Sequence, residues 1–251
     1  MTTPLTKNKK MVNKTRILAI IPARSGSKRV PKKNIKDFLG KPLLSYPVEV
    51  CIKSGLFSDV MVSTDSIEVA NIAKSFGASV PFLRSDEAAN DFAPMNLVIK
   101  EVLQQYDKLG ISFDYVFCIY PAAVTLTKKW LEGALDMLSN SKATSLISVV
   151  RFSYPIQRSL KMKESRLSLN FSESFHKRSQ DLEPTYHDAG QFYLAKSEHF
   201  HKSYRFLTDE ALGMELPESE VQDIDTIEDW KIAELKYQMH RASKGKVNNE
   251  V

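Results

Sequence analysis

Short apolar runs alternate along the chain with segments in which apolar residues recur every three or four positions. The short runs have the length and composition of buried strands, and they cover 16–21, 59–63, 80–83, 114–120, 145–150 and 190–195. The periodic segments predict helices over 40–53, 65–76, 96–109, 127–138 and 226–239. Such alternation favours an α/β fold with a mostly parallel sheet that carries helices on both faces. In folds of this kind, ligands bind outside the carboxyl ends of the strands.

The alternation breaks between 152 and 184. This stretch is polar, with short alternating pieces such as 166–171, and it predicts an inserted arm rather than part of the sheet. We therefore expect a single domain over 15–240 that carries the arm. Residues 1–14 form a basic tail that we expect to be disordered, and 241–251 form a polar tail.

Several helix boundaries carry specific signals. Asp65 precedes the second helix and Glu68 follows three residues later, which is the spacing of a capping box. Gly77 follows that helix in the position of a left-handed C-terminal residue, and Ile67 is expected on its inner face. Pro47 lies within the first predicted helix, where it should either occupy the first turn or kink the helix.

The composition indicates the cellular compartment in which the protein works. Of the 251 residues, 43% are hydrophobic and 26% are charged, as in an ordinary globular protein, and the net charge of +5 is concentrated near the start. Cys51 and Cys118 sit in apolar runs away from any CxxC motif, which predicts buried free thiols in a reducing compartment. No segment has the ~18 consecutive apolar residues of a membrane span, and no signal peptide is recognisable. We therefore expect a soluble, cytoplasmic protein that does not bind membranes.

The loop after the first predicted strand, PARSGSKRVPKKN over 22–34, holds five cations among small residues. Gly26 allows the backbone to approach a ligand closely, and Ser25 and Ser27 add hydroxyls. Successive backbone N–H groups can form an anion-binding nest there, and Arg and Lys supply the charge that a triphosphate needs. The loop has neither the P-loop nor the dinucleotide spacing. A solvated basic loop is the alternative, which the position at the carboxyl end of a strand disfavours.

A second candidate site is VQDIDT, over 221–226. Residues two apart in an extended segment point the same way, so Asp223 and Asp225 would share a face with Ile224 anchored in the core behind them. Two carboxylates about 7 Å apart are well placed to hold Mg²⁺, which prefers oxygen ligands. Alternatively, Asp225 and Glu228 form a capping box for the last helix, which would leave Asp223 unexplained.

A third candidate site precedes the last predicted strand. It combines a cation, amides, carboxylate, imidazole and aromatic rings, a mixture that suits a polar, acidic sugar. Its members are Arg178, Gln180, Tyr186, His187, Asp188, Gln191 and Tyr193. A neighbouring His and Asp are more often structural than catalytic, and no Ser, Cys or Lys is evidently placed to complete a nucleophilic triad.

Together these pieces resemble the acylneuraminate cytidylyltransferase family, enzymes that activate nonulosonic acids as CMP-sugars. The resemblance rests on IIPARSGSKRVPKKNIKDFLGKPLL, VSTDSIEVANIAKSFGASVPFLR and VQDIDTIEDW, and it extends over 17–237. PIQRSL and RSQDLEPTYHDAGQFY are most similar to the pseudaminic acid branch. The family implies a Rossmann-like nucleotide-diphospho-sugar transferase fold, a homodimer, and an arm that completes the neighbouring subunit's site.

The resemblance also implies roles for individual residues. CTP would be bound by Ala23, Arg24, Ser25, Gly26, Ser27, Lys28, Lys33, Asn34 and Arg84, the last of these near the base. Asp223 and Asp225 would hold Mg²⁺, while Arg24 and Lys28 would stabilise charge on the leaving pyrophosphate. The implied reaction is in-line attack by the anomeric hydroxyl of the sugar on the α-phosphorus of CTP. Arg178 and Gln191 are candidates for the sugar carboxylate or hydroxyls.

Two departures from the family pattern suggest an altered sugar pocket. Sialic acid members commonly carry a Leu-Gln-Pro-Thr-Ser-Pro run where this chain has IYPAAV over 119–124, and Met95 stands where Ser or Thr is usual. Both changes argue against plain sialic acid as the acceptor. Legionaminic acid, N-acetylneuraminate and 3-deoxy-manno-octulosonate are the alternatives to pseudaminic acid. A basic nucleic-acid-binding module is a more distant alternative, since 22–36 lacks stacking aromatics, and we expect no nucleic-acid partner.

Overall fold

The computed structural model of the protein describes residues 15–90 and 92–247. The expected disordered tail, 1–14, lies outside the described residues, as do 248–251. The described part of the expected polar tail, 241–247, continues the last helix. No helix of the described residues is long and apolar enough to cross a membrane.

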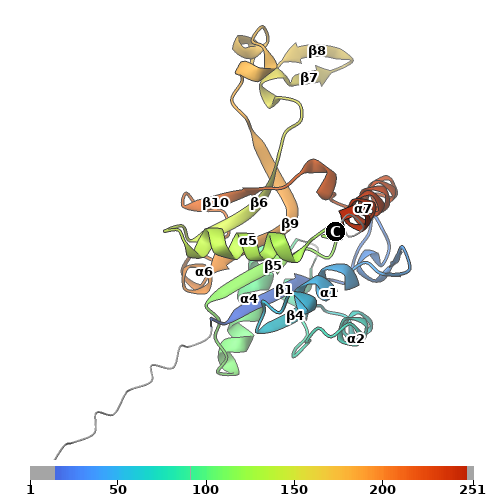
Figure 1. The fold of residues 1–251 in the computed structure, drawn as a ribbon, viewed down its shortest axis with the longest axis vertical. Helices are drawn as coiled ribbons and strands as arrows, with labels where there is room; N and C mark the ends of the chain where they lie inside the picture. Colours follow the sequence, from blue (N-terminus) through green and yellow to red (C-terminus); the bar gives the residue numbers. More distant parts are fainter. Residues whose placement is uncertain (1–14, 91, 248–251) are drawn as a thin grey trace, which may run out of the picture.

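A six-stranded sheet forms the centre of the molecule, in the order β10-β6-β9-β5-β1-β4 (Figure 1). Its strands are β1 (Ile17–Pro22), β4 (Asp59–Ser63), β5 (Tyr115–Ile119), β6 (Ser145–Arg151), β9 (Tyr186–Lys196) and β10 (Ala211–Glu215). β1 pairs in parallel with β4 and β5, and β10 with β6, whereas β9 runs antiparallel between β5 and β6. The predicted α/β fold with a mostly parallel sheet is therefore confirmed. The carboxyl ends of all strands but β9 lie at one edge, where β9 begins.

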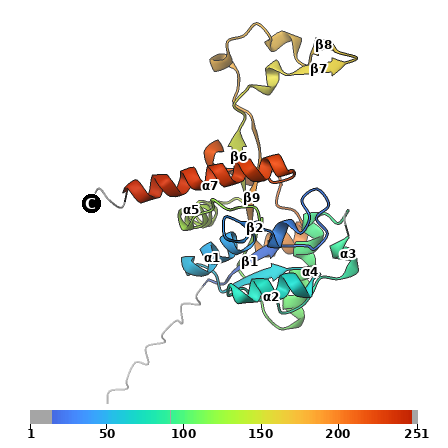
Figure 2. The same cartoon turned by 90° about the vertical axis from the view of Figure 1, so that its right-hand side faces the viewer.

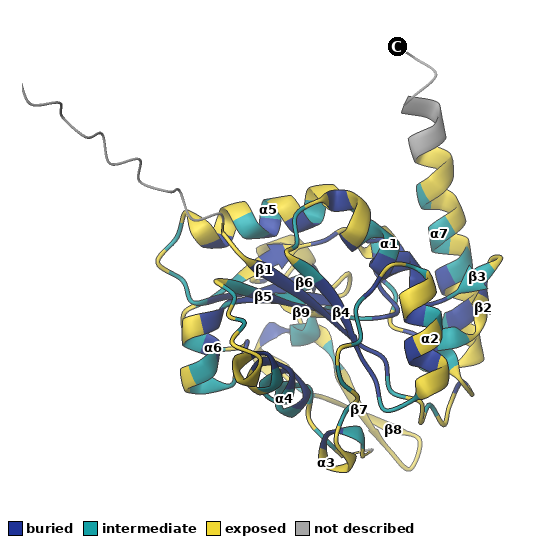
Figure 3. Cartoon of the chain, turned by 90° about the horizontal axis from the view of Figure 1, so that it is seen from below, coloured by how far each residue is buried: buried dark blue, intermediate teal, exposed yellow. Residues whose placement is uncertain are grey.

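Helices cover both faces of the sheet, as expected (Figures 2 and 3). They are α1 (Ser45–Ser54), α2 (Ile67–Ser75), α3 (Asp86–Ala89), α4 (Met95–Lys108), α5 (Lys128–Ser139), α6 (Ser197–Ser203) and α7 (Ile227–Val247). α1, α2 and α5 bury apolar side chains in one core cluster, whereas α4 and α6 contribute to a second cluster built on the other side chains of β1 and β5. Short 3-10 helices are η1 (Lys33–Ile35), η2 (Ile156–Arg158), η3 (Ser172–Ser174), η4 (Ser179–Asp181) and η5 (Glu218–Glu220).

Two strand predictions were wrong or incomplete. Segment 80–83 forms no strand, because Pro81 lacks an N–H group, and its neighbour Ser79 makes only an isolated bridge to Met61. β10 was not predicted, since it is an edge strand whose sequence, ALGME, has no clear alternation. The two cysteines are buried free thiols as expected, and burial raises the pKa of each.

The helix boundaries give mixed results. The predicted capping box of α2 was wrong, since Ser66 is the N-cap and its side chain accepts a hydrogen bond from the backbone N–H of Val69 at 3.4 Å. Ile67 is 62% exposed rather than inward. Gly77 does follow the helix with a φ of +92°, and Pro47 occupies the first turn of α1 without kinking it.

Residues 152–185 leave the sheet between β6 and β9 and project as an arm (Figures 1 and 2). The arm ends in an antiparallel hairpin of β7 (Leu160–Lys163) and β8 (Arg166–Leu169). Every residue of the two strands is exposed. The hairpin therefore contributes no side chain to the core of its own chain.

A third apolar cluster packs the segment that follows β1 against the last helix, α7. The hairpin of β2 (Asp37–Phe38) and β3 (Lys41–Pro42) places Phe38 against α7. The Phe38 ring is fully buried, and its centroid lies 5.2, 5.3 and 5.9 Å from those of Tyr46, Trp230 and Tyr237. Such edge-to-face contacts stabilise the cluster beyond the effect of burying the rings. This aromatic cluster holds the basic loop beside the segment that contains the two aspartates.

β9 contains a large bulge. Tyr193 pairs with Ile147 and Asp188 pairs with Val149, so four residues of β9 oppose the single residue Ser148 of β6. Gly190 lies in the bulge with a φ of +60°, a conformation that favours glycine. The Ser148 hydroxyl donates to the carbonyl of residue 192 at 2.8 Å and accepts from its N–H at 3.1 Å, which replaces the interrupted ladder. Bulges commonly re-aim side chains beside active sites.

We expect Phe38→Ala to lower the free energy of unfolding by about 3–5 kcal/mol, because a fully buried ring would leave a cavity. Chemical denaturation of the two proteins measures the difference. The matched control is Leu109→Ala, at a side chain that is 58% exposed, which should change stability by less than about 0.5 kcal/mol. Equal effects of the two substitutions would contradict the role of the aromatic cluster.

Candidate active site

The basic loop is anchored at the carboxyl ends of β1 and β4. The backbone N–H of Ala23, a buried residue, donates to the Ser63 carbonyl at 2.8 Å. Asn34, also buried, donates from Nδ2 to the Arg24 carbonyl at 2.9 Å and so ties the end of the loop to its beginning. The cations between these two anchors are therefore held above the edge of the sheet.

Asp65 is a second anchor of this loop. Its carboxylate accepts hydrogen bonds from the Ser25 backbone N–H at 2.8 Å and from the Ser25 hydroxyl at 2.6 Å. Burial raises the pKa of Asp65, but the hydrogen bonds from Ser25 outweigh this effect and lower it overall. Nearby, Lys32 pairs with Glu68 at 2.8 Å. Both acidic residues of the expected capping box therefore bind the loop instead of capping the helix.

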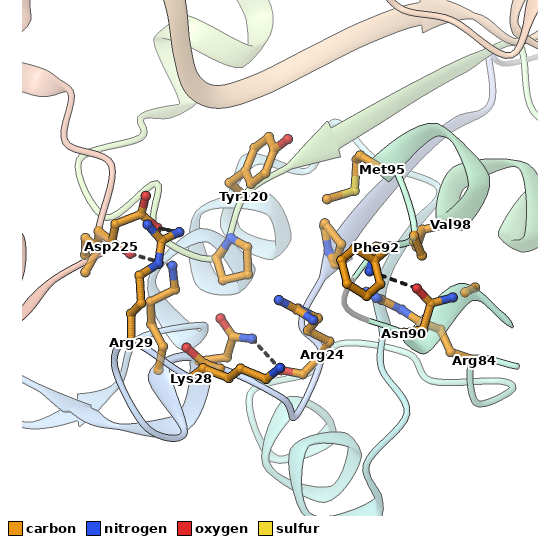
Figure 4. Close-up of a pocket in the computed structure, with 18 residues that line it drawn as sticks. Arg24, Lys28, Arg29, Arg84, Asn90, Phe92, Met95, Val98, Tyr120 and Asp225 are labelled. Atoms are coloured by element: carbon orange, nitrogen blue, oxygen red, sulfur yellow. Dashed lines mark hydrogen bonds and ion pairs between the residues drawn. The ribbon is translucent and has the colours of Figure 1, made fainter. Parts of the chain in front are cut away.

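A cavity of about 520 Å³ lies over the loop (Figure 4). Its floor comes from the loop, the last residue of β1 and the residues that follow β5, and its far wall comes from α3, α4 and the segment between them. The loop contributes Arg24, Ser27, Lys28, Arg29, Lys33 and Asn34. The far wall contributes Ala88, Asn90, Phe92, Ala93, Met95 and Val98, and the remaining lining residues are Pro22, Arg84, Tyr120, Pro121, Ile224 and Asp225. One end of the cavity is thus strongly cationic.

Arg84 is a largely buried cation beside the start of the loop. Its Nε donates to the Ser63 hydroxyl at 2.9 Å, and its terminal nitrogen donates to the Ser63 carbonyl at 2.8 Å. Burial lowers the pKa of Arg84 to about 10, while the Asp65 carboxylate opposes this shift. Arg84 therefore stays charged at neutral pH and is fixed in one orientation.

The segment with the two aspartates closes the other side of the cavity. Ile224 is fully buried, and its carbonyl accepts a hydrogen bond from the Lys33 ammonium group. Asp225 lines the cavity and pairs with Arg29 at 2.7 Å (Figure 4). Asp223 is exposed and does not line the cavity. Burial raises the pKa of Tyr120, and the negative charge of Asp223 adds a smaller contribution in the same direction.

The predicted capping box of Asp225 and Glu228 was wrong. Thr226 and Asp229 cap α7 reciprocally: the Thr226 N–H donates to the Asp229 carboxylate at 2.7 Å, and the Asp229 N–H donates to the Thr226 hydroxyl at 3.1 Å. The sequence spacing misled because the box begins one residue later. Asp225 is consequently not needed as a cap, which removes the structural alternative for this carboxylate.

The donor set fits a magnesium ion that is shared with a substrate. No group of three or more His, Cys, Asp or Glu side chains in 15–90 and 92–247 could hold a metal. Asp223 and Asp225 flank a buried residue on a segment without further acidic ligands. Mg²⁺ commonly binds through one or two carboxylates together with substrate phosphates and water, so these two residues suit it better than a closed structural site would.

A second cavity, of about 580 Å³, adjoins the first. It is largely apolar, with Ile147, Val149, Phe206, Leu207, Ala211, Leu212 and Gly213 in its lining. Its polar members are Asn96, Tyr186, His187, Asp188, Tyr193 and Arg205. Met95 and Tyr120 line both cavities, so the two spaces meet at the carboxyl end of β5.

The structure brings most, but not all, of the candidate residues together. Arg178 and Gln180 lie on the arm and line neither cavity, and Arg178 pairs with Asp181 at 2.7 Å. Gln191 is buried and donates to backbone carbonyls of the bulge. Ser25 and Gly26 belong to the loop but do not line the first cavity.

Sequence reasoning missed several residues of the two cavities. Arg29 is one of the cations of the predicted loop, so its charge and position indicate a role in the site that the sequence analysis did not assign to it. Phe92, which is 94% exposed, and Arg205 follow no motif, and only the chain path brings them to the cavities.

Comparison with known proteins identifies the family. Residues 18–240 match the cytidylyltransferase family. The chain belongs to this family. It is 37% identical over 227 residues to the pseudaminic acid cytidylyltransferase of Campylobacter jejuni, covering 90% of this chain and 98% of that protein. It is 30% identical to the CMP-N,N'-diacetyllegionaminic acid synthase of Legionella pneumophila, covering 90% and 98%. The expected family and the expected nucleotidyltransferase class are both confirmed.

Solved structures share the fold. A CMP:2-keto-3-deoxy-manno-octonic acid synthetase in complex with CTP has a TM-score of 0.64 and 15% identity, covering 91% of this chain and all of that one. A 4-diphosphocytidyl-2C-methyl-D-erythritol synthase has a TM-score of 0.63 and 13% identity, covering 89% and 98%. At these identities the likeness concerns the fold alone. It confirms the expected α/β fold with a mostly parallel sheet and helices on both faces.

We expect Asp65→Ala to raise the KM for CTP about tenfold, because the loop loses the acceptor of two Ser25 hydrogen bonds. Asp65→Asn, which keeps one acceptor oxygen, should have a smaller effect. Steady-state pyrophosphate release at varied CTP concentration measures both. The matched control is Asp136→Ala, an exposed carboxylate on α5 outside both cavities, and a KM equal to this control would refute the anchoring role.

Proposed function

We propose that the chain transfers CMP from CTP to the anomeric hydroxyl of a nonulosonic acid, most specifically pseudaminic acid, and releases pyrophosphate. The observation that carries this proposal is the meeting of a cationic cavity and a mostly apolar cavity at Met95 and Tyr120. A donor in the first space and an acceptor in the second would react at their junction. The similarity over nearly the whole length of a pseudaminic acid cytidylyltransferase supports the choice of acceptor.

The first cavity suits a nucleoside triphosphate. Arg24, Lys28 and Arg29 supply positive charge at the end formed by the basic loop, and cations of this kind neutralise the charge that develops on a leaving pyrophosphate. Phe92 lies in the far wall and Arg84 beside the start of the loop, and an exposed ring and a fixed guanidinium group are both suited to contact the base. Phosphoryl transfer of this type depends on positioning and charge stabilisation more than on covalent catalysis.

Asp223 and Asp225 are the residues that would hold Mg²⁺. When bound there, the ion would neutralise phosphate charge and make the attacking hydroxyl more acidic. Asp225 is now paired with Arg29, and a triphosphate would offer Arg29 a stronger partner. The exchange would leave the Asp225 carboxylate available at the same position.

The second cavity suits an acidic sugar with apolar substituents. Arg205 lines this cavity and supplies a positive charge. A guanidinium group can bind a carboxylate through two parallel hydrogen bonds. Apolar side chains such as Phe206 and Leu212 would cover methyl and acetamido groups. Arg178 and Gln180 lie on the arm, so they would have to act in the site of a neighbouring subunit. A homodimer joined through the arm, magnesium dependence and a cytoplasmic location all belong to this proposal.

We expect the purified chain, with CTP and Mg²⁺, to turn over pseudaminic acid at least about tenfold faster, as kcat/KM, than three other acceptors. These are N,N'-diacetyllegionaminic acid, N-acetylneuraminate and 3-deoxy-manno-octulosonate. A tenfold preference corresponds to about 1.4 kcal/mol, which a few pocket contacts supply. Pyrophosphate release measures the rate, and ATP and UTP in place of CTP are the controls. A preference for another acceptor would contradict the proposed substrate, and no turnover of any acceptor would contradict the proposed reaction.

We expect Asp223→Ala to reduce turnover at least about 100-fold without unfolding the chain, because Asp223 is exposed and holds up no part of the core. The same change should weaken Mn²⁺ binding in the presence of a non-hydrolysable CTP analogue, which electron paramagnetic resonance reports directly. Asp209→Ala, an exposed carboxylate that lines neither cavity, is the control. Unchanged Mn²⁺ binding would remove Asp223 from the metal site.

A further inference from the structure

The junction of the two cavities contains one group that can exchange a proton. Met95 and Tyr120 are the residues that both linings share. A thioether neither gives nor takes a proton at neutral pH, whereas a phenol can donate one hydrogen bond and accept another. An acceptor hydroxyl that attacks a nucleotide at this junction would therefore meet Tyr120.

Tyr120 is the first member of a hydrogen-bonded chain. Its hydroxyl donates to the Tyr193 hydroxyl at 3.5 Å, and the Tyr193 hydroxyl donates to the Asp188 carboxylate. The two rings meet edge to face with their centroids 5.6 Å apart. The other carboxylate oxygen of Asp188 accepts from the Gly190 N–H at 2.8 Å, which fixes its orientation. Catalytic hydrogen bonds are often long without substrate and shorten when it binds.

The bulge in β9 makes this chain possible. Asp188 and Tyr193 are five residues apart, and in a regular strand an odd separation places two side chains on opposite faces. The extra residues around Gly190 bring Tyr193 back to the side of Asp188. The bulge interrupts a buried ladder, and Ser148 compensates for it with two hydrogen bonds to residue 192. Bulges of this kind often re-aim a side chain beside an active site, and here the bulge places the Tyr193 hydroxyl next to the Asp188 carboxylate.

We propose that Tyr120, Tyr193 and Asp188 form a proton relay that removes the proton of the attacking anomeric hydroxyl. This inference rests on the proposed function. As the acceptor oxygen forms its bond to the α-phosphorus of CTP, the bond from that phosphorus to pyrophosphate breaks. The acceptor proton moves to the Tyr120 oxygen, the Tyr120 proton moves to Tyr193, and the Tyr193 proton moves to the Asp188 carboxylate. Both tyrosines end as neutral phenols, and Asp188 carries the proton.

The surroundings suit each member of the relay. Burial and the nearby negative charges raise the pKa of Tyr120 and of Tyr193, so both hold their protons at neutral pH and can pass one on. The tyrosines are partly buried, whereas Asp188 is exposed and can return its proton to water.

Other titratable groups face this chain without joining it. The negative charge of Asp223 acts on Tyr120, the buried thiol of Cys118 stays neutral, and Arg205 lines the same cavity as Asp188. His187 also lines that cavity, but its Nδ1 lies 2.8 Å from the backbone carbonyl of residue 188, and its ring packs against Phe152 at 4.9 Å. These contacts of His187 therefore lead away from Tyr120.

The test compares single-turnover rates of the full-length chain with CTP, Mg²⁺ and the acceptor that the wild type turns over best. We expect Tyr120→Phe, Tyr193→Phe and Asp188→Asn each to lower this rate about 100-fold, the size of a general-base contribution. The double variant Tyr120→Phe/Asp188→Asn should be no slower than the slower single variant, because residues that act as one unit are not additive. Tyr115→Phe, at the opposite end of β5 and outside both cavities, is the matched control and should keep the wild-type rate.

Two readouts distinguish a relay from a structural role. Asp188→Glu, which keeps a carboxylate as the last acceptor of the chain, should recover most of the rate that Asp188→Asn loses, whereas a merely structural role would tolerate the isosteric Asn better than the longer Glu. In mixtures of light and heavy water, the wild-type rate should depend non-linearly on the deuterium fraction, and Tyr120→Phe should abolish this curvature. A Tyr120→Phe variant with wild-type rate, or with reduced rate and unchanged curvature, would overturn the relay while leaving the proposed function intact. A wild-type chain that turns over no acceptor would instead overturn the proposed function and, with it, the relay.

Discussion

The aromatic cluster around Phe38 is the constraint on which the site depends. It packs the residues that follow the loop at 22–34 against the segment at 221–226 and α7, although these lie far apart along the chain. Phe38 fills the space between α1 and α7, and Ile224 joins the same cluster. Lys33 then reaches the Ile224 carbonyl and Arg29 reaches Asp225. A mainly apolar cluster thus determines which charges meet, and the polar contacts refine the arrangement.

The directions of the strands determine where the second cavity forms. All strands but β9 end at one edge, so loops from distant parts of the sequence converge there. β9 begins at that same edge because it runs the other way, and its first residues therefore reach the second cavity. A single antiparallel strand in an otherwise parallel sheet allows a sugar-sized cavity to form beside the nucleotide cavity.

Local signals were the part of the fold that the sequence revealed. β4 was predicted at its observed bounds, because DVMVS is a short apolar run between polar residues. The basic loop was recognisable by composition, and the family resemblance joined it to the aspartates. Interactions between distant segments were not recognisable. An Asp before a helix with a Glu three residues later is a capping signal, and only the fold shows that Asp65 turns to Ser25 instead. The pairing of Asp188 with Tyr193 contradicts strand periodicity, so a bulge had to be seen before that contact could be inferred.

The ion pair of Arg29 with Asp225 has a consequence for the order of assembly. Both side chains are partly open to water, at 69% and 38% exposure, and an ion pair of this kind contributes little to stability. It costs little to break, yet it keeps the acidic segment electrically balanced while the nucleotide is away. A triphosphate that draws Arg29 to itself would uncover a carboxylate, so the affinity for one ligand becomes linked to the presence of the other. The site would then be a cooperative one, in which an anion creates the place for its own counter-ion.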